Sequence, residues 1–167
     1  MRVYSDKKKL MTILLLAAAL GVCPAVDAKA DIVKRRATVL RMKGVVDIYQ
    51  KLDSKWTVPE KGMVLHEKDI IRTREESYLD INIKGIGNDP MAFVRIKDNT
   101  ELTLETLALD QVTGDQETLL DLAIGTVLIK ADKLEGESRF EVYTPTSMVA
   151  VRGTIFEVSV KSADKRE

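Results

Sequence analysis

The sequence predicts one all-β domain behind an export signal, and three observations carry that prediction. Beyond residue 30 the apolar runs are short, and several alternate with polar residues, as at Leu79, Ile81 and Ile83. This alternation is typical of a strand with one buried face. Glycines and other turn-forming residues stand beside the ends of these runs. The longest leucine run does not follow the period of a helix.

The candidate strands follow one another at a spacing that suits a β-sandwich or a β-solenoid equally well, since no strict repeat is visible. They are residues 44–49, 69–73, 78–83, 91–96, 100–104, 107–109, 118–124, 126–130, 140–143, 147–151 and 155–160. About eleven short strands without a long helix define an all-β, single-domain fold.

The leucine run in residues 102–109 tests the alternative of a helix. At 100° per residue its four leucines do not share one helical face. In an extended chain they alternate, except that the step from Leu104 to Leu107 is odd. An odd step reverses which side chains point inward, so we predict a bulge or corner at Glu105 and Thr106.

Residues 1–30 have the features of a secretory signal peptide. A basic start (residues 1–9) precedes an apolar or small-residue run (residues 10–22), and small residues follow up to Ala30. The apolar run has 13 residues, whereas a membrane-spanning helix needs about 20. We therefore expect export to the periplasm or cell envelope of a bacterium, with cleavage after Ala28 or, better, after Ala30.

The one cysteine, Cys23, lies inside this leader. Residues 20–23 resemble a lipoprotein box, so lipid attachment at Cys23 is an alternative to simple cleavage. A chain cut after Ala30 contains no cysteine and therefore no disulfide or thiol chemistry. We expect a leader at residues 1–30, a β domain at 31–160 and a polar tail at 161–167.

The charge balance gives no support to nucleic-acid binding. The whole chain carries 26 basic and 26 acidic residues, of which residues 1–30 hold five and two. The remainder has 21 basic and 24 acidic residues, a net charge near −3. A nucleic-acid-binding domain usually shows the opposite excess.

No constellation of residues predicts catalysis, a metal site or a cofactor. The one histidine, His66, lies in a predicted turn and has no nucleophile pattern near it. Neighbouring acids such as Glu75 and Glu76 would face opposite sides of a strand, so a solvated face is the simpler interpretation than a glycosidase pair. Residues 85–89 lack the lysine and following helix of a phosphate loop. We predict a protein that is not an enzyme and needs no cofactor.

Two further features have a structural and a functional interpretation. Trp56 is either a packing residue or part of a ligand platform, and aromatic residues are few. In the string TPTSMVAVRGTIFEVSV (residues 144–160), the inward side must change between Val151 and Phe156, which are five residues apart. Gly153 can supply the backbone angle for that corner. We expect Arg152 to lock the corner by hydrogen bonds; an anion clamp is the alternative.

Ordered motifs along the chain are similar to those of the FecR-type domain, from about Val39 to Val160. They are Gly44-Val45-Val46, Trp56, Val58-Pro59, Gly62, Leu65, Asp69-Ile70-Ile71, Thr73, Ser77, Ile96-Lys97-Asp98-Asn99-Thr100, Leu122-x-x-Gly125-Thr126-Val127, Phe140-x-Val142-x-Thr144-Pro145-Thr146, Val151-Arg152-Gly153-Thr154 and Phe156-x-Val158. The closing motif is the most specific of them.

The resemblance implies an envelope-facing all-β domain with a β-solenoid-like or roll-like stack, for which a β-sandwich is the alternative. It implies no catalytic residues, and the matching positions are expected to be structural. The signature residues are Trp56, Gly62, Asp69, Thr73, Gly125, Thr144, Pro145, Val151, Arg152, Gly153, Thr154 and Phe156.

Some members of the family are periplasmic parts of transmembrane regulators that act on a sigma factor. Here nine residues precede the apolar run, so we expect a free-standing exported domain that binds an envelope protein in signalling or envelope assembly. An exposed strand edge can recruit such a partner by strand addition. The alternatives are a sensor retained in the membrane by its leader and a polysaccharide-binding module.

Overall fold

The computed structural model describes residues 31–161, and the predicted leader and the tail after Lys161 lie outside them. The described part contains thirteen strands and one short 3-10 turn, η1 (Ile86–Asn88), but no α-helix. The strands are β1 (Ile32–Lys34), β2 (Ala37–Lys43), β3 (Val46–Gln50), β4 (Lys55–Thr57), β5 (Val64–Leu65), β6 (Ile70–Thr73), β7 (Tyr78–Lys84), β8 (Pro90–Ile96), β9 (Glu101–Asp110), β10 (Gln116–Ala131), β11 (Arg139–Tyr143), β12 (Met148–Val151) and β13 (Ile155–Val160).

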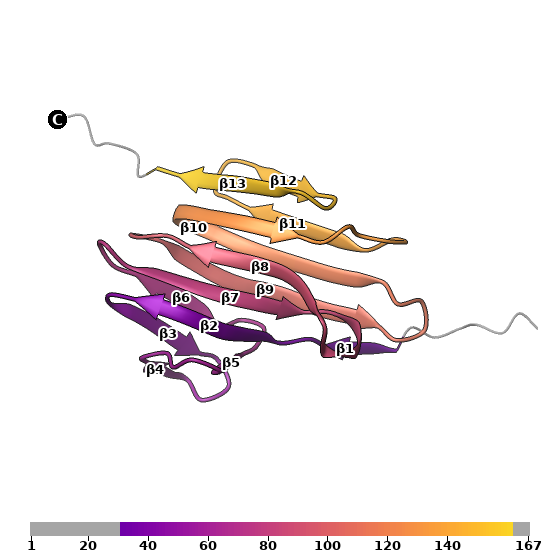
Figure 1. The fold of residues 1–167 in the computed structure, drawn as a ribbon, viewed down its shortest axis with the longest axis horizontal. Helices are drawn as coiled ribbons and strands as arrows, with labels where there is room; N and C mark the ends of the chain where they lie inside the picture. The colour runs from indigo at the N-terminus through magenta and orange to yellow at the C-terminus, as the bar shows by residue number, and fades with distance from the viewer. Residues whose placement is uncertain (1–30, 162–167) are drawn as a thin grey trace, which may run out of the picture.

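The strands form one sheet that curls over on itself (Figure 1). We call one half sheet A: β1, β3, β4, β6, β9, β11, β12 and the first part of β10. The other half is sheet B: β2, β5, β7, β8, β13 and the second part of β10. All pairings except β10 with β11 are antiparallel. The all-β prediction is confirmed, and the fold is a roll whose two halves face each other like the layers of a sandwich.

The strand count differs from the expected one for two reasons. Residues 100–104 and 107–109 belong to the single strand β9, and residues 118–124 and 126–130 belong to the single strand β10. Strands β1, β2, β4 and β5 were not predicted from the sequence, and three of them have only two or three residues. Such short segments do not show a period of two.

The core lies between the two sheets and consists of the inward side of the alternating strands. Leu79, Ile81 and Ile83 are fully buried, as their alternation predicts. Inward residues of β3, β6, β8, β9, β10 and β11 are also buried. They are Ile48, Ile71, Leu102, Leu104, Leu107, Val94, Ile96, Leu120, Leu122, Val127, Ile129, Phe140 and Val142. Burying this apolar area is the main favourable contribution to folding.

The predicted bulge in the leucine run is present at Glu105. Leu120 pairs with Leu104, whereas Leu119 pairs with Thr106, so one residue of β9 has no counterpart in β10. This extra residue allows Leu104 and Leu107 to point into the same core although they are three positions apart, an odd step.

Four neighbouring corners carry the chain from one sheet to the other at the same end of the roll. They lie at Gly44 between β2 and β3, at residues 74–77 between β6 and β7, at residues 97–100 between β8 and β9, and at Gly125 inside β10. Strand β10 therefore pairs with β9 and β11 before Gly125 and with β8 and β13 after it.

Five hydroxyl side chains join these corners, and we call them the corner ladder: Ser77, Thr73, Thr100, Thr126 and Ser159. Thr73 Oγ1 donates to the carbonyl of Lys97 at 2.5 Å and accepts the N–H of Thr100 at 3.0 Å. Thr100 Oγ1 in turn donates to a carbonyl, that of Asp98, at 3.0 Å and accepts the N–H of Thr126 at 2.9 Å.

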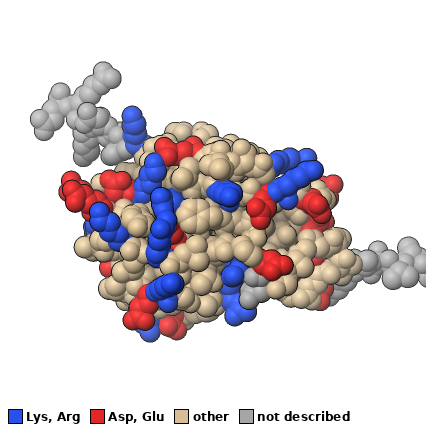
Figure 2. Space-filling view, viewed as in Figure 1, with Lys and Arg blue, Asp and Glu red and all other residues tan. Residues whose placement is uncertain are grey.

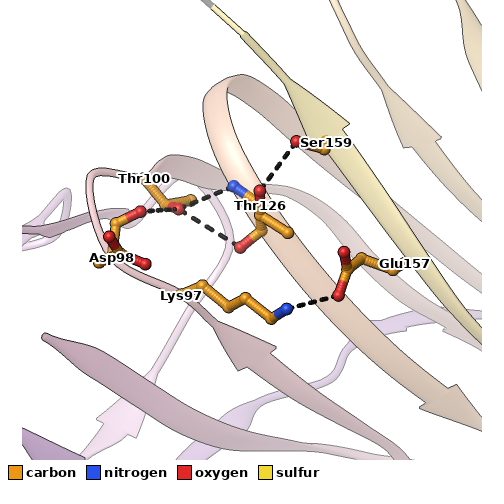
Figure 3. Close-up of polar contacts among 6 residues, drawn as sticks. All are labelled: Lys97, Asp98, Thr100, Thr126, Glu157 and Ser159. Atoms are coloured by element: carbon orange, nitrogen blue, oxygen red, sulfur yellow. Dashed lines mark hydrogen bonds and ion pairs between the residues drawn. The ribbon is translucent and has the colours of Figure 1, made fainter. Parts of the chain in front are cut away.

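The ladder continues to both sides of this centre. Ser77 Oγ accepts the N–H of Val45 at 2.9 Å, and the hydroxyls of Thr126 and Ser159 lie 2.9 Å apart (Figure 3). The side chains of Thr73, Ser77 and Thr100 are buried. Because a buried N–H or hydroxyl without a partner costs about 1–3 kcal/mol, these contacts specify how the corners stack.

A buried arginine ties the two sheets together at the opposite end. The Arg35 guanidinium donates to the carbonyl of Lys84 in sheet B at 3.0 Å and to those of Ala108 and Glu117 in sheet A at 2.9 and 2.7 Å. It also donates to Thr118 Oγ1 at 2.5 Å. Burial lowers the pKa of Arg35 to about 10 despite the opposing effect of Glu67, so the side chain stays charged at neutral pH.

Gly125 gives a direct test of the corner geometry. Its φ is +99°, and a Cβ added there would overlap the backbone and side chain of Thr100. Gly62 has a similar φ of +87°, but an added Cβ would meet nothing within 4 Å. We expect Gly125→Ala to lower the free energy of unfolding by roughly 2 kcal/mol more than Gly62→Ala does. Urea denaturation measures both values; equal losses would contradict the close stacking of the corners.

Candidate functional site

The side of the roll that holds β12 and β13 has two unpaired strand edges. Among the described residues β12 pairs only with β11, in sheet A, and β13 pairs only with β10, in sheet B. Both strands lie at the top of the molecule in Figure 1. At the opposite side the edge strands β4 and β5 have three and two residues, whereas β13 has six. Short edges are a common protection against pairing with another chain, and β13 does not have it.

A groove of about 750 Å³ runs between β13 and the turn that joins β11 to β12. Val149, Phe156 and Val160 line it, and each is only partly buried against the core. Ile124 lies at the same groove and is 38% exposed. The apolar core therefore reaches the surface beside the free edge of β13.

The backbone groups at this edge follow from the hydrogen bonds of β10. The N–H of Ala131 donates to the carbonyl of Thr154 at 3.2 Å, so the odd-numbered residues of β10 face β13. Val127 and Ile129 pair with Val158 and Phe156. The N–H and C=O groups of the intervening β13 residues 155, 157 and 159 therefore point to the unpaired edge.

The two polar outward side chains of β13, Glu157 and Ser159, bond to residues of neighbouring segments. The Glu157 carboxylate lies 2.5 Å from Lys97 Nζ, and Ser159 Oγ lies 2.9 Å from Thr126 Oγ1. Figure 3 shows both side chains turned towards these partners. Neither side chain therefore covers the outward N–H and C=O groups of β13.

The signature residues fall into three groups, the first of which is divided between the corners and the groove. Thr73 and Gly125 belong to the corners, and Thr144, Pro145 and Phe156 line the groove. Thr144 Oγ1 also accepts the N–H of Ser147 at 3.0 Å, which closes the turn between β11 and β12.

A second group lies at the far side, near β4. The buried Asp69 carboxylate accepts the N–H groups of Lys51 and His66 at 2.9 and 2.8 Å. Gly62 donates its N–H to the carbonyl of Val39 at 2.8 Å. Trp56 is 45% exposed, and the Arg72 guanidinium lies 4.4 Å from its ring centroid.

The third group forms the crossing from sheet A to sheet B. Val151 ends β12 and is buried, and residues 152–154 lead into β13. The strand–corner–strand prediction is thus confirmed. The expected hydrogen bonds of Arg152 are not found: its side chain is exposed and bonds to no residue within 31–161. Gly153 holds the corner instead, because its φ is +78° and an added Cβ would lie 2.6 Å from the Cα of Lys133.

Comparison with known proteins agrees with this distribution of motifs. The model of the family described as FecR protein matches residues 69–166. The chain belongs to the FecR family. The matched region begins at Asp69 and includes all five residues of the corner ladder, the groove and β13, whereas Trp56 and Gly62 precede it. No curated protein and no solved structure matches the chain.

Membership of the FecR family gives the coarse function of the chain, since this is a family of regulation and signalling rather than of enzymes. Within residues 31–161 no three His, Cys, Asp or Glu side chains are placed to share a metal ion. In the same residues no helix is long and apolar enough to cross a membrane. His66 lies beside Asp69, and its backbone N–H donates to the Asp69 carboxylate.

An ion-pair cluster on the outer face of sheet B is a second polar feature of the FecR domain. Asp80 is completely buried between Arg41 and Arg95, and the Arg95 contacts measure 2.7 and 2.9 Å. Arg95 also lies over the Tyr78 ring, 5.1 Å from its centroid. Figure 2 shows this face with basic and acidic side chains interspersed. The cluster fastens β2, β7 and β8 together and leaves no large area of one charge.

Several structurally important residues were not singled out from the sequence. Ser77, Thr100 and Thr126 stand within the family motifs, but no local pattern shows that their hydroxyls meet. The sequence signal that could have revealed the corner ladder is a Ser or Thr beside each of the successive turns. Arg35 and Asp80 carry no such signal, because a charged residue in a strand or turn is usually solvated.

The Asp80 cluster predicts a specific pH dependence of stability. Burial alone would raise the pKa of Asp80, but hydrogen bonds and charge from Arg95 and Arg41 outweigh it and hold this pKa below its usual value of 3.8. The stabilisation is therefore present above pH ~4 and is lost as the pH falls through the lowered pKa.

We expect Asp80→Asn to lower the free energy of unfolding by about 1–3 kcal/mol at pH 7 and by clearly less near pH 3. Chemical denaturation at several pH values measures the difference. Asp121→Asn, on the exposed side of β10, is the control and should have little effect at either pH. A loss for Asp80→Asn that does not change with pH would contradict the charge-based account.

Proposed function

We propose that this FecR protein is a non-catalytic, exported module that binds another protein in the periplasm or cell envelope, in signalling or envelope assembly. The single observation that carries the proposal is the free edge of β13 beside the apolar groove. Family membership supports a regulatory task, and the predicted leader supports export.

Strand addition is the binding mode that fits this edge best. An added strand receives backbone hydrogen bonds from the host edge and inserts alternate side chains into pockets beside it. Residues 155, 157 and 159 offer the backbone groups, and the groove beside Phe156 and Val160 offers apolar contacts. Both elements of the recognition lie side by side in the FecR domain.

The mode of attachment to the envelope separates two versions of this proposal. Cleavage after Ala30 would release a soluble domain, whereas lipidation at Cys23 or an uncleaved leader would hold it at a membrane. Cys23 lies outside the described residues. A membrane-retained sensor related to the sigma-factor regulators would use the same edge, so the mass of the mature N-terminus distinguishes these versions.

Polysaccharide binding is less well supported than protein binding. The natural platform would be Trp56, but Arg72 lies over its ring and Tyr49 packs beside it with ring centroids 5.4 Å apart. These contacts favour a packing role for Trp56 at the edge of sheet A.

A proline on the free edge tests strand addition. The Ser159 N–H points away from β10, so Ser159→Pro removes an edge donor without removing a backbone hydrogen bond of the roll. We expect Ser159→Pro to abolish specific capture of an envelope protein by the purified domain while the melting temperature changes by only a few degrees. Ser159→Ala, which also loses the contact with Thr126, is the matched control and should retain capture.

A photo-reactive residue at position 157 should cross-link to the captured protein. Equal capture by the wild type and Ser159→Pro, or cross-linking only from the far side of the roll, would contradict strand addition at β13.

A further inference from the structure

We propose that the edge of β13 also pairs with β13 of a second copy of this chain, antiparallel and about a twofold axis at Val158. This inference rests on the proposed function in one respect, because it uses the same free edge. It adds a partner of known sequence, and it adds a regulatory consequence for the binding of other proteins.

The strand has none of the usual guards against such pairing. Proline, lysine and β-bulges are common protections of an edge strand. Residues 155–160 contain no proline and no lysine, and their pairing with β10 has no bulge. The one charged side chain, Glu157, is already neutralised by Lys97 at 2.5 Å. The edge therefore presents a regular row of backbone groups without an unpaired charge among its own side chains.

The side-chain pattern favours a register centred on Val158 over one centred on Glu157. Directly opposite residues in an antiparallel pair point to the same face, so a twofold axis between two identical strands must pass through a residue. An axis at Glu157 would place two carboxylates opposite each other, which is unfavourable. An axis at Val158 places Glu157 opposite Ser159 of the second copy and Phe156 opposite Val160 of the second copy.

The Val158 register also satisfies the free backbone groups. Glu157 and Ser159 both direct their N–H and C=O groups outward, so Glu157 of one copy and Ser159 of the other form a hydrogen-bonded pair, twice in the dimer. Val158 faces its own copy in a non-hydrogen-bonded pair, where side chains approach most closely.

Apolar contacts would follow from the same arrangement. Phe156 and Val160 are only partly covered by their own core, and aromatic–β-branched pairs across strands are among the favourable ones. Ile155 and Met148, which are 63% and 53% exposed, lie on β13 and on the neighbouring edge strand β12. Pairing would continue sheet B from one copy into the other and cover the open side of both cores.

Self-pairing and partner binding exclude each other, because both occupy the backbone groups of residues 157 and 159. Dilution of the chain, or a high concentration of partner, would then release the edge. The dimer is a resting form in which the binding strand is protected.

Cysteine cross-linking of the exported chain, in a Cys23→Ser background, tests the register. The Cα atoms of opposite residues in a hydrogen-bonded pair lie about 5.5 Å apart, within the range of a disulfide. We expect the double variant Glu157→Cys, Ser159→Cys to give a disulfide-linked dimer on mild oxidation. The single variants should not, because their Cα atoms would be about 7–8 Å apart on the diagonal, beyond the usual range of a disulfide.

Sedimentation equilibrium of the wild type should show a concentration-dependent dimer. Ser159→Pro, which removes a backbone donor from each copy, should weaken the dimer by roughly tenfold or more. Cross-linking of Glu157→Cys alone would overturn the register. A persisting dimer without cross-linking of the double variant would overturn pairing at β13.

A chain that stays monomeric at every concentration would overturn self-pairing altogether. If that monomer still captures an envelope protein in a Ser159-dependent way, the proposed function stands. If the chain dimerises as described but captures nothing, the proposed function fails and self-pairing stands.

Discussion

The fold depends on one constraint: the chain must turn sharply between two sheets at four adjacent places without leaving buried backbone groups unpaired. The hydroxyls of the corner ladder satisfy this constraint. Thr73 bonds to a carbonyl and an N–H of the turn at residues 97–100, and Thr100 donates to a carbonyl of its own turn and accepts the N–H of Thr126 at the next corner. Gly125 allows β10 to continue from sheet A into sheet B close against Thr100. Arg35 performs a similar task at the other end with charge-assisted hydrogen bonds to both sheets.

The same construction explains why binding is expected at one side of the roll. Strand β10 is shared between the sheets and is paired on both edges at residues 117–121 and 127–130. On this side of the roll, β12 is the edge strand of sheet A and β13 is the edge strand of sheet B. The core between them is only partly covered. The last contact of the corner ladder, between Thr126 and Ser159, joins β13 to β10, and the two strands pair without a register shift. A contact that stabilises the fold thus also positions β13, the strand to which we assign recognition.

Much of the fold was predictable because it rests on local patterns. Alternation located most of the long strands, and odd steps in that alternation located the bulge at Glu105 and the crossing near Gly153. The short strands and the joining of residues 116–131 into one strand were not predictable, because they depend on pairing partners distant in the sequence. The misjudged role of Arg152 has the same origin: its exposure is set by how β12 and β13 meet. The edge as a site could be anticipated only in general terms, because an unpaired strand is a property of the topology.

Amide hydrogen exchange along β13 tests the central claim most directly. In a dilute, partner-free sample the amides of residues 156, 158 and 160 should exchange slowly, because they bond to β10, and those of residues 155, 157 and 159 should exchange fast. The three fast amides should become protected when the chain is concentrated or its partner is added. Slow exchange of all six amides in the dilute sample would show that the edge is not free. Fast exchange of residues 155, 157 and 159 that persists in the bound state would show that the edge is not used.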